Sequence, residues 1–430
     1  MKICPTCQRV FHNDAGFCPE DGTHLKTASS APAMPQGEDR HIGTRLCGRY
    51  EIRRVIADGG MGRVYEGIDK QTDSRVAVKV LHEDVARDEV SLERFKREYE
   101  ISALLPHEHI VHVLDFQRDP VSSTWLLVME YLDGEELRCV LRRDRVLGSA
   151  RLVRMLSQVA VGLDGAHARN FIHRDIKPDN LFLCGTREGD VVKLLDFGSV
   201  KDQSGQRKKL TMLGTTIGSP YYMSPEQAQG LDSIDARADV FALAAVTYEC
   251  ITGQVPFGGV NGPSILLAIL TEQPVPPSQR APGAASTIPP DVDQVVLRAL
   301  AKAPAARFAS VGALADAVGH AYGLSGQHRE WATTSQQVIG QQIDAALPML
   351  MSQRVQALAV VADPFAAPQA QAEGDSAPER ALDAAFSSTR EAEFGAYGVP
   401  TRARWVLPVM VGLVALLVGG VATFVVLTSR

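Results

Sequence analysis

The pattern of hydrophobic and polar residues predicts three strands in the first third of the chain. Apolar and polar residues alternate over residues 50–56, and this period of two is typical of a strand. Residues 125–129 form a short, continuous apolar run, which predicts a buried strand. A further strand is expected over residues 76–79, Val-Ala-Val-Lys. All three strands lie within residues 50–129.

Longer segments show the spacing of helices. Residues 91–105 carry their apolar side chains on one stripe, and residues 151–169 are also amphipathic, so both predict helices. Residues 239–246 are apolar nearly all round after Asp239, which predicts a buried helix. A buried carboxylate must be hydrogen-bonded, so Asp239 is expected to have backbone or side-chain partners.

The C-terminal part of the chain changes character twice. Residues 325–362 could hold one or two helices, because Ile339, Ile343 and other apolar residues recur at helical spacing. Residues 363–401 are rich in Ala, Pro, Gln and Glu, and we expect them to be disordered.

Residues 405–427 contain no charged residue and predict a transmembrane helix. At 1.5 Å per residue this span is about 34 Å long, enough to cross a bilayer. Residues 325–404 are then a largely disordered juxtamembrane region. Arg402 and Arg404 precede the span, and this bias predicts a single-pass protein of the cell membrane whose N-terminal side is cytoplasmic. Only three residues follow, so we expect signals to arrive from inside the cell, through the membrane helix, or through the N-terminal head.

Composition is that of an ordinary globular protein. Hydrophobic residues make up 45% and charged residues 22% of the 430 residues. The net charge of −6 gives no global attraction to nucleic acid, which we therefore exclude as a partner. The seven cysteines show no disulfide pattern, which favours a reducing compartment, and no apolar signal segment follows the initial Met1.

Three of the cysteines crowd at the N-terminus. Cys4 and Cys7 form a C-x-x-C knuckle, and Cys18 begins a second knuckle in which Asp21 stands where another Cys would be. The segment resembles a zinc-ribbon knuckle pair. We predict a zinc-ribbon-like head over residues 1–26, with a structural Zn²⁺ held by these four residues.

Two alternatives stay open for this head. His12 or His24 could replace the carboxylate as fourth ligand, since a Cys₃Asp site should bind zinc less tightly than Cys₄. The other reading is three reduced thiols on a flexible segment without metal. Residues 27–45 are rich in Ala, Ser, Pro and Gly and predict a linker.

Two polar stretches in the middle of the chain suggest phosphate chemistry. Residues 173–180 read His-Arg-Asp-Ile-Lys-Pro-Asp-Asn, and residues 193–198 read Lys-Leu-Leu-Asp-Phe-Gly. These motifs, H-R-D-x-x-x-x-N followed by D-F-G, resemble those of bacterial, eukaryotic-like Ser/Thr protein kinases. The Lys at position 177 is what Ser/Thr-directed members carry.

The resemblance implies a role for each polar residue of these stretches. Asp175 would accept the proton of the attacking hydroxyl, and Lys177 would offset the charge of the transferred phosphoryl group. Asn180 and Asp196 would hold Mg²⁺ (or Mn²⁺), which prefers oxygen ligands. Positioning and charge neutralisation would then carry the catalysis.

The strand-rich segment would bind ATP. Residues 57–64 form a glycine-rich turn whose amides can approach phosphates, although Ala57 replaces its first glycine. Lys79 would contact the phosphates and pair with Glu98, which could otherwise belong to a surface charge cluster. Residues 130–132 resemble the hinge beside adenine, with Met129 at the back of the pocket. The resemblance assigns nucleotide binding to Ile56, Gly59, Gly60, Gly62, Val64, Ala77, Lys79, Glu130 and Leu132.

Residues 199–226 resemble an activation segment. The segment ends in Ser-Pro-Glu at residues 224–226. Ser219 would contact Asp175 and Lys177 of residues 173–180, which would form the catalytic loop. By resemblance, Glu226 pairs with Arg307, and Asp239 holds the backbone of the catalytic loop.

The same segment suggests a switch. A phosphate there could pair with Arg174, so we expect autophosphorylation at Thr215 and Thr216 ahead of Thr211. The alternative is that these threonines only solvate the loop and a carboxylate satisfies Arg174.

The predicted fold is α+β: a bilobal kinase domain over residues 50–320, with a small β-rich lobe and a large helical lobe. The predicted function is transfer of the γ-phosphoryl of ATP to Ser/Thr hydroxyls of protein substrates, with possible homodimers for autophosphorylation in trans. A pseudokinase scaffold and a small-molecule kinase are the alternatives. A pseudokinase would lack one of the predicted catalytic or metal-binding residues. A small-molecule kinase would lack the element that ends at Glu226.

Overall fold

A computed structural model describes residues 2–3, 10–11, 23, 26–27, 39–197, 201–202, 220–231, 233–280 and 288–362. All of them lie in the first of two compact units, Met1–Phe365. The second unit, Ala366–Arg430, contains the predicted membrane span and lies outside the described residues. In the head, a small antiparallel sheet joins β1 (Lys2–Ile3), β2 (Val10–Phe11) and β3 (Lys26–Thr27).

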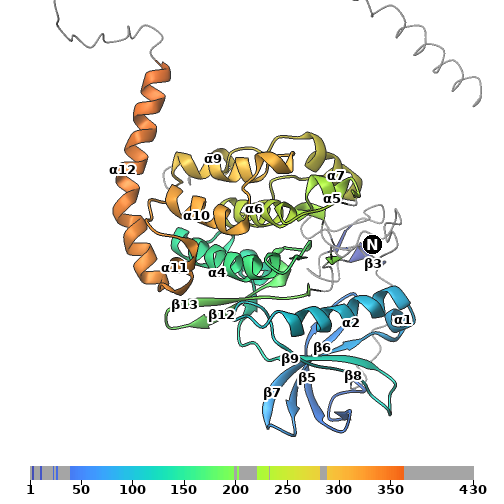
Figure 1. The fold of residues 1–430 in the computed structure, drawn as a ribbon. Coiled ribbons are helices and arrows are strands. Elements are labelled where there is room, and N and C mark those ends of the chain that lie inside the picture. The colour runs from blue at the N-terminus through green and yellow to red at the C-terminus, as the bar shows by residue number, and fades with distance from the viewer. Residues whose placement is uncertain are drawn as a thin grey trace, which may run out of the picture. The chain divides into compact units, whose positions relative to one another are not determined.

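The small lobe is a six-stranded antiparallel sheet with the order β4-β5-β6-β7-β9-β8 (Figure 1). Its strands are β4 (Arg45–Leu46), β5 (Tyr50–Asp58), β6 (Gly62–Asp69), β7 (Ser74–Leu81), β8 (Val113–Arg118) and β9 (Trp125–Glu130). A short helix α1 (Glu83–Ala86) and the longer α2 (Glu89–Leu104) lie between β7 and β8 in sequence. The three predicted strands are therefore confirmed with slightly wider bounds, and the predicted helix is confirmed with its start two residues earlier and its end one residue earlier.

Alternation along β7 gives the sheet two different faces. Val76, Val78 and Val80 are buried in a cluster that also contains Tyr50 and Leu126. The intervening residues point to the opposite face, because successive side chains of a strand alternate. That second face packs against α2, where Phe95 lies in a separate apolar cluster. The predicted nucleotide residues Ala77 and Lys79 belong to this second face.

The large lobe is mainly helical. Its long helices are α4 (Ser149–His167), α6 (Arg237–Thr252), α7 (Gly262–Thr271), α9 (Pro290–Ala299) and α10 (Val311–Ala321). Shorter elements are β10 (Glu135–Glu136), α3 (Leu137–Asp144), β11 (Phe171–Ile172), η1 (Pro178–Asn180), β14 (Lys201–Asp202), η3 (Pro220–Tyr222), α5 (Pro225–Ala228), α8 (Pro277–Arg280) and η5 (Pro304–Ala306). As predicted, α6 is buried on nearly every side, and it starts two residues before Asp239.

One hairpin determines where the two polar stretches lie. Strands β12 (Leu181–Thr186) and β13 (Gly189–Leu194) pair antiparallel, with Leu181 opposite Leu194. The first stretch ends where β12 begins, and the second continues beyond the end of β13. Antiparallel pairing therefore brings both stretches to the same end of the hairpin.

The folded domain extends beyond both predicted boundaries. The predicted linker over residues 27–45 is wrong at its end, because Asp39 and His41 pack on the small lobe and Arg45 opens β4. Beyond residue 320, α11 (His328–Thr333) and α12 (Gln336–Ala362) follow, in the segment where one or two helices were predicted. Both contact α4 (Figure 1).

Candidate active site

The backbone of the catalytic loop is held by a buried carboxylate from α6. Asp239 accepts hydrogen bonds from the amides of His173 (2.9 Å) and Arg174 (2.8 Å), as the resemblance implied. His167 Nε2 lies 2.7 Å from the same carboxylate. Although burial opposes ionisation, the contact with His167 holds the pKa of Asp239 below its ordinary value. Arg174 has a positive φ of 66°, a conformation that this backbone anchoring sustains.

Asp175 lies at the centre of a small polar cluster. Its Oδ2 atom is 2.9 Å from Lys177 Nζ and accepts from Asn180 Nδ2 at 3.2 Å. The same amide nitrogen donates to the backbone oxygen of Asp175 at 2.7 Å. Burial raises the pKa of the Asp175 carboxyl, and the Lys177 cation opposes that shift. The predicted base, cation and amide are thus adjacent.

Asp196 lies beside this cluster because the two loops are joined. The amide of Leu195 donates to the backbone oxygen of Asn180 at 2.9 Å. His173 adds a contact between its Nε2 and the Leu195 oxygen at 3.0 Å, and its ring lies 4.7 Å from that of buried Phe197. Asp196 itself has a positive φ of 57°.

The donor atoms at the meeting point of the loops fit a magnesium ion. Because Asn180 uses its N–H groups towards Asp175, its amide oxygen is the atom left to face a cation. With the carboxylate of Asp196 this provides oxygen ligands only, the set that Mg²⁺ prefers. Mg²⁺ is commonly held by one or two protein carboxylates together with substrate phosphates, so a small protein donor set is sufficient.

The predicted ion pair of the small lobe is present. Lys79 Nζ on β7 lies 2.8 Å from Glu98 Oε2 on α2, and the two side chains are only 15% and 7% exposed. Glu98 is therefore directed into the lobe, and the alternative of a surface charge cluster is wrong for this residue. The pair fixes the position of the Lys79 ammonium group.

Two of the residues predicted to contact the nucleotide lie on the same face of the sheet as that ammonium group. Val64 pairs directly with Lys79 across β6 and β7, and Ala77 pairs with Met129 across β7 and β9. Ile56 lies where the β5–β6 register shifts and is 40% exposed.

Two side chains tie the hinge segment to its surroundings, and the first is Tyr131, whose ring lies under the Arg75 guanidinium. Glu130 lies 2.7 Å from Lys193 Nζ and also accepts from the His112 amide at 2.8 Å. Leu132 lies two residues further along the chain and is partly buried.

The glycines of the turn differ in how much space a side chain would have at each position. Gly62 cannot carry a side chain, because a Cβ there would lie 2.3 Å from the carbonyl oxygen of Val80. Gly59 and Gly60 lie at the open tip of the turn. An open tip lined by backbone amides is the arrangement that phosphate groups can approach.

The end of the predicted activation segment is anchored as expected. Arg307 donates from both terminal nitrogens to Glu226, at 2.7 and 2.8 Å, and the pair is buried. Such a two-bond pairing of arginine with carboxylate is strong and directional. Ser219 and Thr211, Thr215 and Thr216 lie outside the described residues.

Neither the zinc site nor the membrane span falls within the described residues. Cys4, Cys7, Cys18 and Asp21 are all outside them, as are His12 and His24. In the part of the chain that the structure describes, no group of three His, Cys, Asp or Glu residues could hold a metal. No helix among those same residues is both long and apolar enough to span a bilayer.

One buried network near the catalytic loop was not predicted. Arg138 on α3 contacts Asp179 of the loop at 3.3 Å and Glu249 of α6 at 2.8 Å, and it donates to the Tyr222 hydroxyl at 2.6 Å. Only 6% of the Arg138 side chain is exposed. A single arginine in an amphipathic stretch reads as a surface residue, so sequence pattern offered no signal for this role.

Comparison with known proteins agrees with this geometry. The family described as "Protein kinase domain" matches residues 50–322. Serine/threonine-protein kinase pkn3 of Myxococcus xanthus is 38% identical over 278 residues, which are 64% of this chain and 50% of that protein. For PknB of Mycobacterium tuberculosis the identity is 38% over 267 residues, 62% of this chain and 41% of that protein. The chain spans about half the length of the curated relatives it matches.

A solved structure is similar as well. The crystal structure of the PknI kinase domain from Mycobacterium tuberculosis superposes with a TM-score of 0.50 at 31% identity, covering 66% of this chain and 98% of that one. The family match covers more than half of the chain and coincides with both lobes and both loops described above. The chain therefore belongs to the protein kinase family, and its folded domain is that of a serine/threonine protein kinase.

Proposed function

We propose that this protein is an active kinase that transfers the γ-phosphoryl group of ATP to Ser and Thr hydroxyls of protein substrates. The observation that carries the proposal is the cluster in which Asp175 contacts Lys177 and Asn180 beside Asp196. It combines a base, a cation and two oxygen ligands in one place. Phosphoryl transfer depends on positioning and charge neutralisation more than on covalent help, so these groups are sufficient.

Each residue of the site has a separate task. The Asp175 carboxylate orients the attacking hydroxyl and accepts its proton, while the Lys177 ammonium offsets charge on the transferred group. Lys79, fixed by Glu98, positions the nucleotide phosphates. Asn180 and Asp196 would hold Mg²⁺ or Mn²⁺, which neutralises phosphate charge when bound.

The rival function is a pseudokinase scaffold that binds partners without catalysis. It would be favoured by loss of one of the four residues Lys79, Asp175, Asn180 and Asp196, and all four are present. A small-molecule kinase is disfavoured by the Ser-Pro-Glu element and its anchored Glu226, since this element shapes a peptide groove in protein kinases.

Incubation with [γ-³²P]ATP, Mg²⁺ and a generic basic protein tests the proposal. We expect label in the protein, and phosphoamino acid analysis should find it on Ser and Thr. A purified chain that binds ATP but labels no protein would support the scaffold instead.

We further propose that phosphorylation of the activation segment switches the enzyme on. Arg174 supports this, because its buried Nε has no hydrogen-bond partner and no ion pair of its guanidinium occurs among the described residues. A guanidinium in this state favours an incoming phosphate, which carries about −1.5 to −2 charge. The acceptors would be Thr215 and Thr216 ahead of Thr211.

A triple Ala variant at Thr211, Thr215 and Thr216 tests the switch. The variant should lose most of its activity, and mass spectrometry should find phosphate on this segment of the wild type. Full activity of the variant, with no phosphate between residues 199 and 219 in the wild type, would exclude the switch while leaving the kinase assignment intact.

Anchoring and metal binding complete the proposal. The uncharged residues 405–427 support a membrane helix, which would confine the chains to two dimensions and favour phosphorylation in trans between two copies.

Cys4, Cys7, Cys18 and Asp21 support a structural zinc ion. Zinc analysis of the full chain against a Cys4→Ser, Cys7→Ser variant tests this, and equal metal content would reject it.

A further inference from the structure

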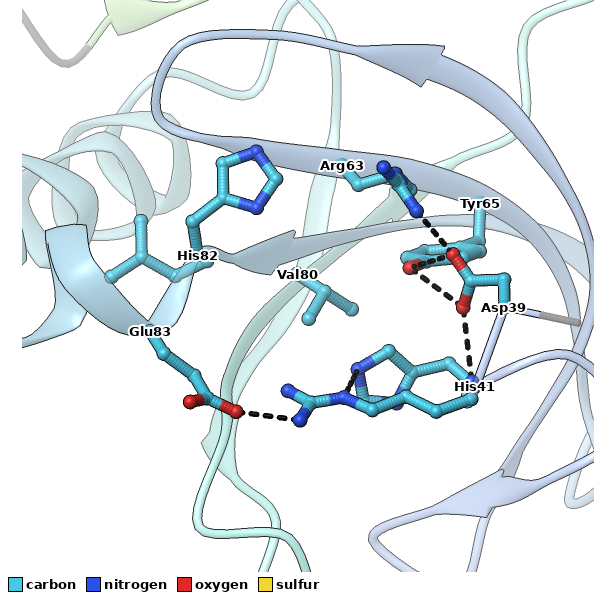
Figure 2. A pocket seen from close by; sticks show the side chains of 9 residues that line it. Asp39, His41, Arg63, Tyr65, Val80, His82 and Glu83 are labelled. Carbon is cyan, nitrogen blue, oxygen red and sulfur yellow. Dashed lines mark hydrogen bonds and ion pairs between the residues drawn. The ribbon is translucent and has the colours of Figure 1, made fainter. Parts of the chain in front are cut away.

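The N-terminal segment of the folded domain, residues 39–41, is bound to strand β6 (Figure 2). Asp39 accepts from the Tyr65 hydroxyl at 2.9 Å and from Arg63 at 2.5 Å, and its side chain is only 11% exposed. Burial opposes ionisation of Asp39, yet hydrogen bonds from the His41 amide and from Arg63 lower its pKa. Together with Val80 and His82 these residues line a cavity of about 320 Å³.

Arg63 connects this segment to the glycine-rich turn. Besides Asp39, the guanidinium donates to Asp58, with Nε at 2.9 Å from Oδ2. Asp58 directly precedes Gly59, the first residue of the open tip. One arginine thus bridges a carboxylate of the N-terminal segment and a carboxylate of the turn.

His82, the residue after β7, holds the other side of the turn. Its Nε2 lies 3.1 Å from the Gly59 oxygen and 3.3 Å from Asp58 Oδ1, and its backbone amide donates to Met61 at 3.1 Å. The N-terminal segment also reaches this end of the cavity. Its Arg40 pairs at 2.6 Å with Glu83, the residue that follows His82.

The two glycines at the tip of the turn have little packing of their own. A Cβ added at Gly60 would meet nothing within 4 Å, and one at Gly59 would meet only the Gly62 oxygen at 3.6 Å. Met61 packs against the apolar cluster that contains Phe95, but the two glycines gain no such contacts. Besides the hydrogen bond from the Gly59 amide to the Gly62 oxygen, their position depends on the polar contacts from Arg63 and His82.

We propose that Arg63 and His82 are positioning residues of the glycine-rich turn, and that Asp39 makes this positioning depend on the N-terminal segment. The inference rests on the proposed role of the turn in binding ATP phosphates. Weakening these contacts increases the population of turn conformations that do not cover the phosphates. Affinity for ATP then falls, while the catalytic loop is unchanged.

Dissociation constants of the full chain for ATP and for adenosine test this inference, since only ATP carries the phosphates. In Asp39→Asn and His82→Leu we expect ATP affinity to fall roughly three- to tenfold, the effect of weakening one charge-assisted or partly exposed hydrogen bond. Adenosine affinity and kcat at saturating ATP should stay within about twofold of wild type. His82→Gln keeps an N–H donor and should restore most of the ATP affinity.

Arg53→Gln is the matched control, because it removes an exposed β5 cation that pairs with Glu51 away from the turn. Wild-type ATP affinity in both test variants would overturn the inference. So would parallel losses of ATP and adenosine affinity, or an equal loss in the control, since either indicates general damage to the lobe. Binding is measured without turnover, so a wild type that binds ATP but transfers no phosphate contradicts only the proposed activity.

Discussion

Two carboxylates of the large lobe have pKa values shifted in opposite directions because their surroundings differ. Asp239 receives hydrogen bonds from two backbone amides and contacts His167, and its pKa is lowered despite burial. Burial raises the pKa of Asp175, and the Lys177 cation opposes this shift. The first carboxylate is suited to hold a loop and the second to exchange a proton. The residue types could be read from the sequence, but the contact with His167 depends on the packing of α4 against α6.

The raised pKa of Asp175 predicts the acid side of the pH profile. The base must be ionised to accept a proton, so kcat/KM should fall as pH decreases through a value above that of an ordinary aspartate. Lys177→Met removes the cation that favours ionisation, so its acid limb should lie at higher pH, in addition to a lower maximal rate. Profiles of kcat/KM against pH for the two proteins measure this shift.

Lys96→Met is the control for that comparison, because Lys96 pairs with Glu100 on the surface of α2, far from Asp175 in sequence and on the other lobe. Its acid limb should coincide with that of the wild type. An unshifted limb in Lys177→Met would mean that Asp175 is not the group that titrates.

At the scale of elements, the β12–β13 hairpin connects the two catalytic loops to the C-terminal helices. Gln158 of α4 contacts the Asp190 and Ala332 oxygens and accepts from the Val192 amide. Arg154 donates to Thr334, and the Gln336 amide donates to Glu188. The helical spacing near residue 339 predicted these helices, whereas their attachment to the hairpin uses polar groups that have no sequence period.

Truncation separates the folded C-terminal helices from the rest of the tail. A chain ending at residue 324 loses the buried side chains of Trp331, Ile339 and Ile343. Each such side chain contributes about 1.5–3 kcal/mol, so the free energy of unfolding should fall by several kcal/mol and phosphoryl transfer should decrease with it. A chain ending at residue 362 keeps these contacts and should match the full kinase domain. Denaturant melts of both truncated chains measure this difference in the free energy of unfolding. Equal stability would contradict the attachment of the C-terminal helices to the hairpin.

Across the whole chain, the interpretation of the sequence depended on several motifs that occur in the order typical of the family. The Lys79–Glu98 and Glu226–Arg307 pairs join residues far apart in sequence, and only resemblance to a family could suggest them. Domain limits were less predictable. Residues 39–46 look like the end of a polar linker, yet Asp39 is held by Tyr65 and Arg63, which a local pattern cannot reveal.

The predicted anchor is also a property of the whole chain. The full-length protein should sediment with membranes after cell lysis, and deletion of residues 405–427 should leave a soluble chain with kinase activity. Recovery of the full-length protein entirely in the soluble fraction would contradict the anchor.

Asp175 is proposed to be the base of this kinase, and the rate of phosphoryl transfer measures that role. Asp175→Asn keeps the size of the side chain and should leave the fold and ATP binding in place. Its transfer rate should fall by roughly 10²- to 10⁴-fold, the usual contribution of a positioned base. Asp144→Asn, a substitution at a surface carboxylate paired with Arg143, should keep the wild-type rate. A wild-type rate for Asp175→Asn, with bound ATP and intact fold, would contradict the account.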